Sequence, residues 1–379
     1  AISVHAKNQG MEYPMICWNY GRPNPDGSYT DRTKFGMISV IIHEVGHNFF
    51  PMIVNSDERQ WGWMDEGLNS FVEYMAEQEF GEKYPEAIAP LDKYPSRRGE
   101  PTKITSYMKG NQEYIAPIMS NPENVYQLGN NAYGKPATAL NILRETVMGR
   151  ELFDYAFATY AKRWMFKHPT PEDFFRTMED ASGIDLDWYW RGWFYTTDYV
   201  DMGVKDVKSY YITDQPTKEG KKVLSNYGIE DPSQVQAVYV VEGASEEYNA
   251  DLEKKDPLEN AATLKEYMMD NFTEQERKKM KVPKHFYQVT FEKPGGLVMP
   301  LIVAYNYKDG TSEKVTYPAQ IWRRNDKEVS RVLATDKVLE SVVVDPDMET
   351  ADVNTENNAW PKEEKPNEFE KFKEQQTKD

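Results

Sequence analysis

The sequence predicts an α+β protein in which a mainly helical part precedes a strand-rich part. In the first half, apolar residues recur every three or four positions, which is the spacing of helices with one buried face. Between residues 285 and 345, polar and apolar residues alternate, which is the pattern of half-buried strands. A chain of 379 residues is long enough for two or three domains with a large core.

Charge and composition exclude several classes of protein. With 45 Lys and Arg against 62 Asp and Glu, the net charge is −17, which argues against nucleic acid or an anionic membrane surface as the main partner. No apolar run approaches the roughly 18 residues that a membrane-spanning helix needs, so we expect no membrane span. Cys17 is the one cysteine, so an intramolecular disulfide is impossible, and the sequence is compatible with an exported or a cytoplasmic protein.

The first part, residues 1–202, contains most of the predicted helices. The aromatic and apolar run at 12–20 predicts one strand, closed by a turn-rich segment. Pro51 stops the helix that follows, because proline cannot continue it. Segment 82–130, rich in Pro, Asn, Gly and Ser, is expected to be a long loop. The predicted helices span residues 33–50, 65–80, 133–148, 151–166, 171–181 and 185–195.

After residue 202 the sequence pattern changes from mainly helical to mixed and strand-rich. We divide it into a mixed strand and helix segment (203–284), a region that resembles a small β-sandwich (285–350) and a charged tail (351–379). The predicted strands span residues 207–212, 235–242, 285–293, 298–307, 313–322 and 339–345, and the charged run 246–280 has the period of a helix.

The stretch IHEVGHN holds two of the five histidines in the chain. On a helix, His43 and His47 lie one turn apart on one face, so both imidazoles can reach one metal ion. Glu44 stands beside them, turned toward a water on that ion but not itself a ligand, which is the arrangement of a zinc hydrolase. The alternative interpretation is a pair of solvated histidines on a polar helix face.

Glu66 supplies the third ligand that a catalytic zinc ion requires. It follows His47 by an 18-residue gap and stands at the start of the second predicted helix. Two antiparallel helices would bring it onto the face of His43 and His47. The sequence therefore predicts one zinc ion held by these three residues rather than a surface carboxylate at position 66. Asp65, Asn48 and Glu73 are candidates for holding the outer nitrogen of an imidazole, as metal-bound histidines usually require.

These motifs resemble the gluzincin aminopeptidases, the family that contains alanyl aminopeptidase and the leukotriene hydrolase–aminopeptidase. HEVGH, the 18-residue gap and the glutamate of WMDEG are similar to the zinc motif of that family. QGMEYP is similar to its exopeptidase motif at Gly10, Met11 and Glu12, with Tyr13 where asparagine is usual. NAYGKPATALNIL is similar to the segment with the family's catalytic tyrosine, and Tyr133 is the match. The likeness covers roughly residues 1–200.

The resemblance implies a thermolysin-like, mainly helical catalytic domain that uses zinc to release residues from peptides with a free amino terminus. In that scheme Glu44 takes the proton of the attacking water, and Tyr133 donates a hydrogen bond to the oxyanion. Glu12 binds the substrate's α-ammonium, and Gly10 and Met11 belong to the same substrate-binding segment. A core tyrosine and an exposed strand carboxylate are the alternative interpretations of Tyr133 and Glu12.

Two departures from the family pattern bear on function. The segment after the second histidine reads NFFPM, which differs from the usual sequence, and only nine residues precede Gly10, where family members carry a β-rich domain. We therefore expect this chain to be the carboxyl-side portion of a longer polypeptide, with the amino-terminal portion as its partner. An inactive scaffold and an epoxide hydrolase are alternative functions, and an endopeptidase is disfavoured because Glu12 would block the amino side of the substrate. The sequence selects no oligomeric state and no preferred amino-terminal residue.

Overall fold

The computed structural model describes residues 1–8, 10–86, 98–232, 235, 237–243, 257–259 and 261–362. The chain divides into two compact units. The first unit comprises Ala1–Asp201, Gly295–Pro300 and Asp347–Val353, and the second comprises Met202–Pro294, Leu301–Pro346 and Asn354–Asp379. Helices and sheets are both present, which confirms the α+β prediction. The thermolysin-like and β-sandwich descriptions stay predictions.

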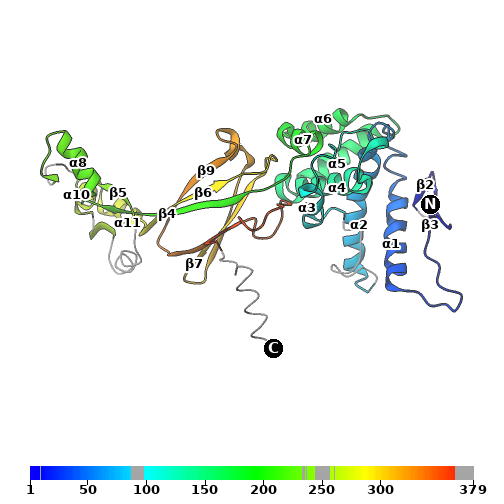
Figure 1. Ribbon diagram of the computed structural model, residues 1–379, viewed down its shortest axis with the longest axis horizontal. Helices are drawn as coiled ribbons and strands as arrows, with labels where there is room; N and C mark the ends of the chain where they lie inside the picture. Colours follow the sequence, from blue (N-terminus) through cyan, green and yellow to red (C-terminus); the bar gives the residue numbers. More distant parts are fainter. Residues whose placement is uncertain are drawn as a thin grey trace. The chain divides into compact units, whose positions relative to one another are not determined.

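The first unit opens with a small three-stranded sheet (Figure 1). Its strands are β1 (Ile2–His5), β2 (Met11–Tyr13) and β3 (Ile16–Asn19), in the order β1-β3-β2, with β1 parallel and β2 antiparallel to β3. The prediction of one strand over 12–20 is wrong. Met15 adopts a left-handed backbone conformation with φ of 66°, and this turn reverses the chain between β2 and β3. Within the described residues, β2 is an edge strand.

The helices of the first unit form its core. They are α1 (Asp31–Gly46), α2 (Leu68–Lys83), α3 (Pro101–Lys109), α4 (Lys135–Ile142), α5 (Arg150–Trp164), α6 (Pro171–Ser182) and α7 (Asp187–Tyr195), with shorter helical segments η1 (Trp63–Gly67), η2 (Pro122–Asn124), η3 (Gly129–Gly134) and η4 (Leu143–Met148). The expectation of a long loop over 82–130 is wrong at α3, and residues 87–97 of that segment lie outside the described residues. Pro101 suits the first turn of that helix, and Ile104 and Met108, four positions apart, are both buried.

Helix ends set the geometry near the HExxH motif. Thr30 caps α1 by accepting a hydrogen bond from the backbone N–H of Thr33. The helix ends at Gly46 and not near residue 50, and His47 is its carboxyl-terminal cap. α1 and α2 lie side by side (Figure 1), in contact with each other. The capping box expected at Thr170 is present at the start of α6, with Asp173 as the reciprocal partner.

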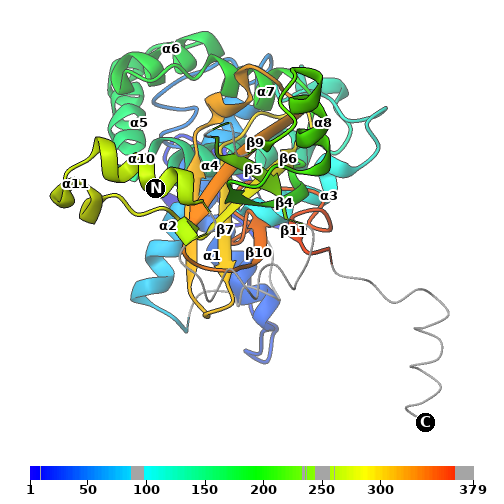
Figure 2. The ribbon, with the colours of Figure 1, turned by 90° about the vertical axis from the view of Figure 1, so that its left-hand side faces the viewer.

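The second unit contains two four-stranded antiparallel sheets, ordered β5-β4-β6-β9 and β11-β10-β7-β8. Figure 2 shows β4, β6 and β9 side by side. The strands are β4 (Gly203–Thr213), β5 (Tyr239–Glu242), β6 (His285–Glu292), β7 (Leu301–Tyr307), β8 (Ser312–Tyr317), β9 (Glu328–Thr335), β10 (Leu339–Val344) and β11 (Ala359–Trp360). Helical segments are α8 (Lys218–Asn226), η6 (Pro257–Glu259), α10 (Ala262–Asn271), α11 (Glu274–Lys279) and η7 (Ala319–Arg323).

Several predictions for the second unit need correction. The sequence analysis assigned β4 and β6 to separate segments, 203–284 and 285–350, whereas the structure pairs them in one sheet. The strand expected over 313–322 ends at Tyr317, because Pro318 cannot donate to the ladder. β9 and α8 were not expected at all. Of the charged run 246–280, residues 246–256 and 260 lie outside the described residues, and the rest contains η6, α10 and α11.

No helix in the described ranges is both long and apolar enough to cross a membrane.

Candidate metal centre

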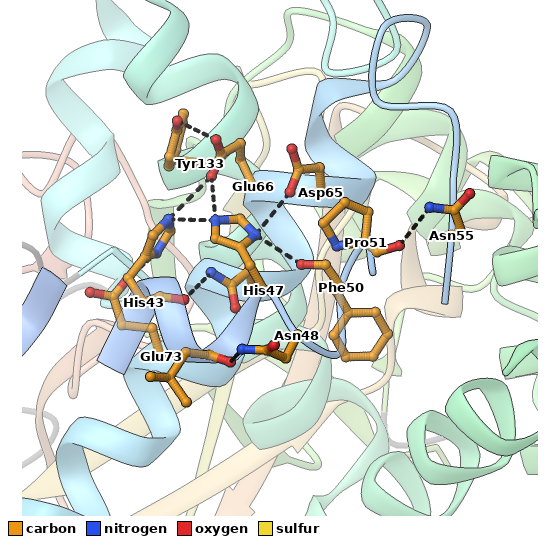
Figure 3. Close-up of polar contacts among 12 residues, drawn as sticks. His43, His47, Asn48, Phe50, Pro51, Asn55, Asp65, Glu66, Glu73 and Tyr133 are labelled. Carbon is orange, nitrogen blue, oxygen red and sulfur yellow. Dashed lines mark hydrogen bonds and ion pairs between the residues drawn. The ribbon is translucent and has the colours of Figure 1, made fainter. Parts of the chain in front are cut away.

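Three donor atoms converge where the carboxyl-terminal end of α1 meets η1 (Figure 3). Nε2 of His43 and Nε2 of His47 lie 3.1 Å apart. Oε2 of Glu66 lies 3.2 Å from the His43 nitrogen and 3.3 Å from the His47 nitrogen. Ligands bound about 2.0–2.1 Å from one tetrahedral zinc ion stand about 3.3 Å from each other. The three donors therefore already have the mutual spacing of a zinc site.

Groups on α2, on η1 and in the turn after α1 hold the outer ring nitrogens. Nδ1 of His43 lies 2.9 Å from Oε2 of the buried Glu73, and Oε1 of Glu73 accepts a hydrogen bond from Ser39 at 2.9 Å. Nδ1 of His47 lies 2.8 Å from the carbonyl oxygen of Phe50 and 3.0 Å from Oδ1 of Asp65. These contacts orient both imidazoles so that their Nε2 atoms face inward.

One of the three candidates for this orienting role is excluded by the structure. Asn48 is half-buried, and its hydrogen bonds go to neither imidazole: its Nδ2 donates to the Val45 carbonyl, and its Oδ1 accepts from the backbone N–H of Met15. Asn48 therefore ties the β2–β3 turn to the end of α1. Position 48 lies outside α1, in the turn after His47, so its side chain does not lie on the helix face of the two histidines.

Electrostatics of the centre follow from burial and close contacts. Burial alone would lower the pKa of His43, but hydrogen bonds to Glu66 and Glu73 outweigh it and raise that pKa to about 9. Burial acts in the same direction on His47, and contacts with Asp65 and Glu66 raise its pKa to about 11. Burial raises the pKa of Asp65. Burial would also raise the pKa of Glu66, but hydrogen bonds from both histidines lower it to about 2. The carboxylates of the cluster therefore favour positive charge at this place.

Glu44 lies beside the centre without taking part in it. Its side chain is 3% exposed, and Oε2 is buried with no hydrogen-bond partner among the described residues. Burial raises the pKa of Glu44 to about 7, although the charges of His43 and His47 oppose the rise. A carboxylate with an unused oxygen and a pKa near neutrality is suited to accept and return a proton.

Gly10 and Glu12 approach the centre from the amino-terminal sheet. Gly10 adopts φ of +77°, which favours glycine, and a Cβ there would stand 3.7 Å from Oε1 of Glu44. A carboxylate oxygen of Glu12 lies within 4.8 Å of donor atoms of His47 and Asp65. Burial raises the pKa of Glu12. Met11, the third residue of this motif, is partly exposed on β2.

Tyr133 lies on the other side of Glu66, at the end of the η3 segment that leads into α4. Its hydroxyl donates a 2.5 Å hydrogen bond to Oε1 of Glu66, and its ring stacks on that of His43 with centroids 5.9 Å apart. Burial and the charge of Glu66 raise the pKa of Tyr133. The guanidinium of Arg98 lies over the Tyr133 ring, 4.4 Å from its centroid.

The structure brings most of the predicted site residues together, although not Asn48, and it adds others. Ser39, Asn69 and Arg98 were not identified from the sequence. Ser39 stands one helical turn before His43, a spacing that could have indicated a shared face. Asn69 donates to the His43 carbonyl at 2.8 Å, and a Cβ at Gly46 would lie 2.1 Å from its Oδ1, so α1 and α2 approach closely there. No local sequence pattern indicates that Arg98 lies near the metal centre.

Comparisons with known proteins relate this chain to aminopeptidases. Residues 24–193 match the model of the peptidase family M1 domain. The chain is 26% identical over 201 residues to the glutamyl aminopeptidase of Bitis rhinoceros, covering 51% of this chain and 20% of the relative. It is 21% identical over 182 residues to aminopeptidase N of Lactococcus lactis subsp. lactis, covering 46% of this chain and 20% of the relative. The chain spans about a fifth of the length of these curated relatives.

Among solved structures, the crystal structure of Legionella pneumophila aminopeptidase A in complex with aspartic acid matches 92% of this chain and 31% of its own length, with a TM-score of 0.51 and 13% identity. That likeness shows a shared fold. An HExxH helix whose two histidines meet a glutamate from the following helical segment defines a gluzincin-type metallopeptidase domain. Residues 24–193 are therefore similar to the domain of peptidase family M1, the gluzincin aminopeptidases.

Proposed function

We propose that this chain is a zinc-dependent aminopeptidase that hydrolyses the amino-terminal bond of peptides. One observation carries the proposal: two buried histidines and the half-buried Glu66 place three donor atoms 3.1–3.3 Å apart, beside a buried carboxylate with an unused oxygen. Two neutral imidazoles and a carboxylate are the donor set of many catalytic zinc sites. When bound, zinc makes a coordinated water more acidic and polarises the carbonyl of the bond to be cut.

Residues of the chain carry out proton transfer, stabilise the developing charge and bind the substrate. Glu44 accepts the proton of the attacking water on its free oxygen and passes it to the leaving amine. Tyr133, held protonated by its raised pKa, donates a hydrogen bond where negative charge develops on the substrate oxygen. Glu12 offers a negative charge within 4.8 Å of His47 and Asp65, which suits the α-ammonium of a peptide. An anchor so close to the centre leaves little room for residues on the amino side, which favours an exopeptidase over an endopeptidase.

The test begins with the metal. Elemental analysis of the purified chain should give close to one zinc ion per chain, and His43→Ala should remove it, whereas His5→Ala, an exposed histidine on β1, should retain it. Full zinc retention in the His43→Ala variant would contradict the ligand assignment.

Turnover is tested next, on zinc-loaded protein with alanyl-p-nitroanilide. Glu44→Gln should keep the zinc and lose turnover, because an amide cannot accept the proton of water. Glu79→Gln, which removes an exposed carboxylate from α2, is the matched control. Glu12→Gln should weaken substrates with a free amine far more than amine-blocked inhibitors. Cleavage of N-acetylated peptides at the same rate as free ones would reject the exopeptidase assignment.

A further inference from the structure

A cavity opens beside Glu12. Its volume is about 670 Å³, within the range of sites that enclose small ligands. Glu12 lines this cavity and also lies within 4.8 Å of His47 and Asp65, so the cavity begins next to the metal centre. The lining residues are Met11, Glu12, Tyr13, Pro51, Met52, Asn55, Ser56, Asp57, Glu58 and His168.

The charged residues that line the cavity are mainly acidic. Asp57 and Glu58 join Glu12 there, and the lining contains no lysine and no arginine. The charge of Glu58 is one of the causes that raise the pKa of Glu12, so the two carboxylates act on each other across the cavity. His168, the only other titratable lining group apart from Tyr13, uses its Nδ1 for the Asn55 carbonyl at 3.0 Å. A ligand group with positive charge would relieve this repulsion.

Ser56 provides an independent indication of a ligand. It is 7% exposed, and it lines the cavity. Its hydroxyl oxygen is buried without a hydrogen-bond partner in the described part of the chain. Buried hydroxyl groups are nearly always hydrogen-bonded, because an unmade bond is unfavourable. A donor that enters the cavity would supply the missing partner.

We propose that this cavity receives the side chain of the substrate's first residue and selects lysine or arginine. The inference rests on the proposed function, since Glu12 must hold the α-ammonium and leave Asp57 and Glu58 for the side chain. The aliphatic stem of the side chain would lie along Met11 and Met52, and its charged end would face the two carboxylates. The same geometry disfavours an acidic first residue, whose carboxylate would meet three like charges.

The test measures the binding of amino acid amides to the zinc-loaded chain by calorimetry. Lysinamide and norleucinamide share the same stem and differ in the terminal ammonium. We expect lysinamide to bind about tenfold more tightly, since each of two exposed carboxylates contributes a factor of about two to five. Glutamic acid α-amide should bind most weakly. The preference should shrink as ionic strength rises, because exposed charges are screened.

Variants assign the preference to named residues. The double substitution Asp57→Asn with Glu58→Gln should bring lysinamide within about twofold of norleucinamide and leave norleucinamide binding unchanged. Glu151→Gln, an exposed carboxylate on α5, is the matched control and should keep the full preference. Equal binding of the two amides by the unmodified chain, an unchanged preference in the double variant, or binding of neither amide overturns the inference.

The outcome separates this inference from the proposed function. If lysyl-, alanyl- and glutamyl-p-nitroanilide are all hydrolysed at the same kcat/KM, the chain is an aminopeptidase and the cationic pocket is rejected. If none is hydrolysed while lysinamide still binds selectively through Asp57 and Glu58, the pocket stands and the proposed function fails.

Discussion

Tyr133 donates a 2.5 Å hydrogen bond to Oε1 of Glu66, while Oε2 of the same carboxylate faces the two histidine nitrogens. One carboxylate therefore connects the phenol to the donor cluster. Burial and the charge of Glu66 both keep the phenol protonated, so Tyr133 is a hydrogen-bond donor at any ordinary pH. A donor held at this place can serve an oxygen that gains charge only during the reaction.

Replacing Tyr133 by phenylalanine should lower kcat about 10²- to 10³-fold and change KM by no more than a few-fold. The reason is that a hydrogen bond to the oxyanion strengthens as the charge forms. Zinc content should stay close to one per chain, because Glu66 keeps both histidine contacts. Tyr126→Phe, an exposed tyrosine, is the control. A loss confined to KM would rule out the oxyanion role.

Glu73→Gln should weaken zinc binding about 10- to 100-fold, as is typical when the carboxylate behind a metal-bound histidine is changed. Glu73 is buried and accepts from both His43 and Ser39, so its charge fixes the ring and makes it a better ligand. Competition with a chromogenic chelator measures the affinity. Glu79→Gln on the same helix should bind zinc like the unmodified chain. Equal zinc affinities in the two variants would show that Glu73 does not strengthen His43 as a ligand.

Zinc affinity should rise steeply with pH. In the metal-free chain, hydrogen bonds to carboxylates raise the pKa of His43 to about 9 and of His47 to about 11 in spite of burial. Zinc binds neutral imidazole, so near pH 7 both rings must lose a proton first. Because raised pKa values favour the protonated rings, zinc affinity falls as pH drops below about 11 and falls more steeply below about 9. Glu66, with its pKa lowered to about 2, is already ionised and releases none.

Calorimetry in buffers of different ionisation enthalpy should therefore detect the release of close to two protons per zinc ion at pH 7. Asp65, whose pKa burial raises, can add a fraction of a proton. Release of no protons would mean that the histidines are neutral before the metal arrives.

The sequence predicted the cluster of donor atoms because its signals are local or nearly so. His43 and His47 differ by one helical turn, and a reversal between two helices was enough to place Glu66 opposite them. Ser39 and Arg98 were not identified, because their contacts depend on where α1 and α2 cross and on how the chain returns after residue 97. The cavity residues Asn55 to Glu58 lie in irregular turns, where no periodic pattern exists to be read.

Strand and turn errors have equally specific causes. The run 12–20 has the composition of a strand throughout, and only the left-handed Met15 divides it into β2 and β3. A methionine gives no warning of that conformation, as glycine or asparagine would. In β9, the sequence EVSRVLAT mixes charged and apolar residues along a strand with little buried surface, so the pattern there is weak.

Lys135 provides a prediction about stability that is separate from the metal. Its side chain is 2% exposed, and Nζ donates to the Thr196 carbonyl at 3.1 Å. Burial lowers its pKa from the ordinary 10.5 to about 8, and the charge of Asp198 only partly opposes this. Between pH 8 and 10.5 the unfolded chain therefore binds this proton while the folded chain does not, so the free energy of unfolding gains a contribution as pH rises through that window.

The Lys135→Met variant should lack that contribution. The difference in unfolding free energy between the unmodified chain and the variant should shift by up to about 3 kcal/mol in favour of the unmodified chain from pH 8 to pH 10.5 and stay level below pH 8. Urea unfolding at a series of pH values, at one zinc concentration, measures it. Lys162→Met, an exposed lysine of α5, controls for the other groups that titrate in this range. If the curves of the unmodified chain and Lys135→Met run parallel from pH 7 to pH 11, Lys135 is charged in the folded protein throughout, and its burial is fully offset by Asp198 and the Thr196 carbonyl.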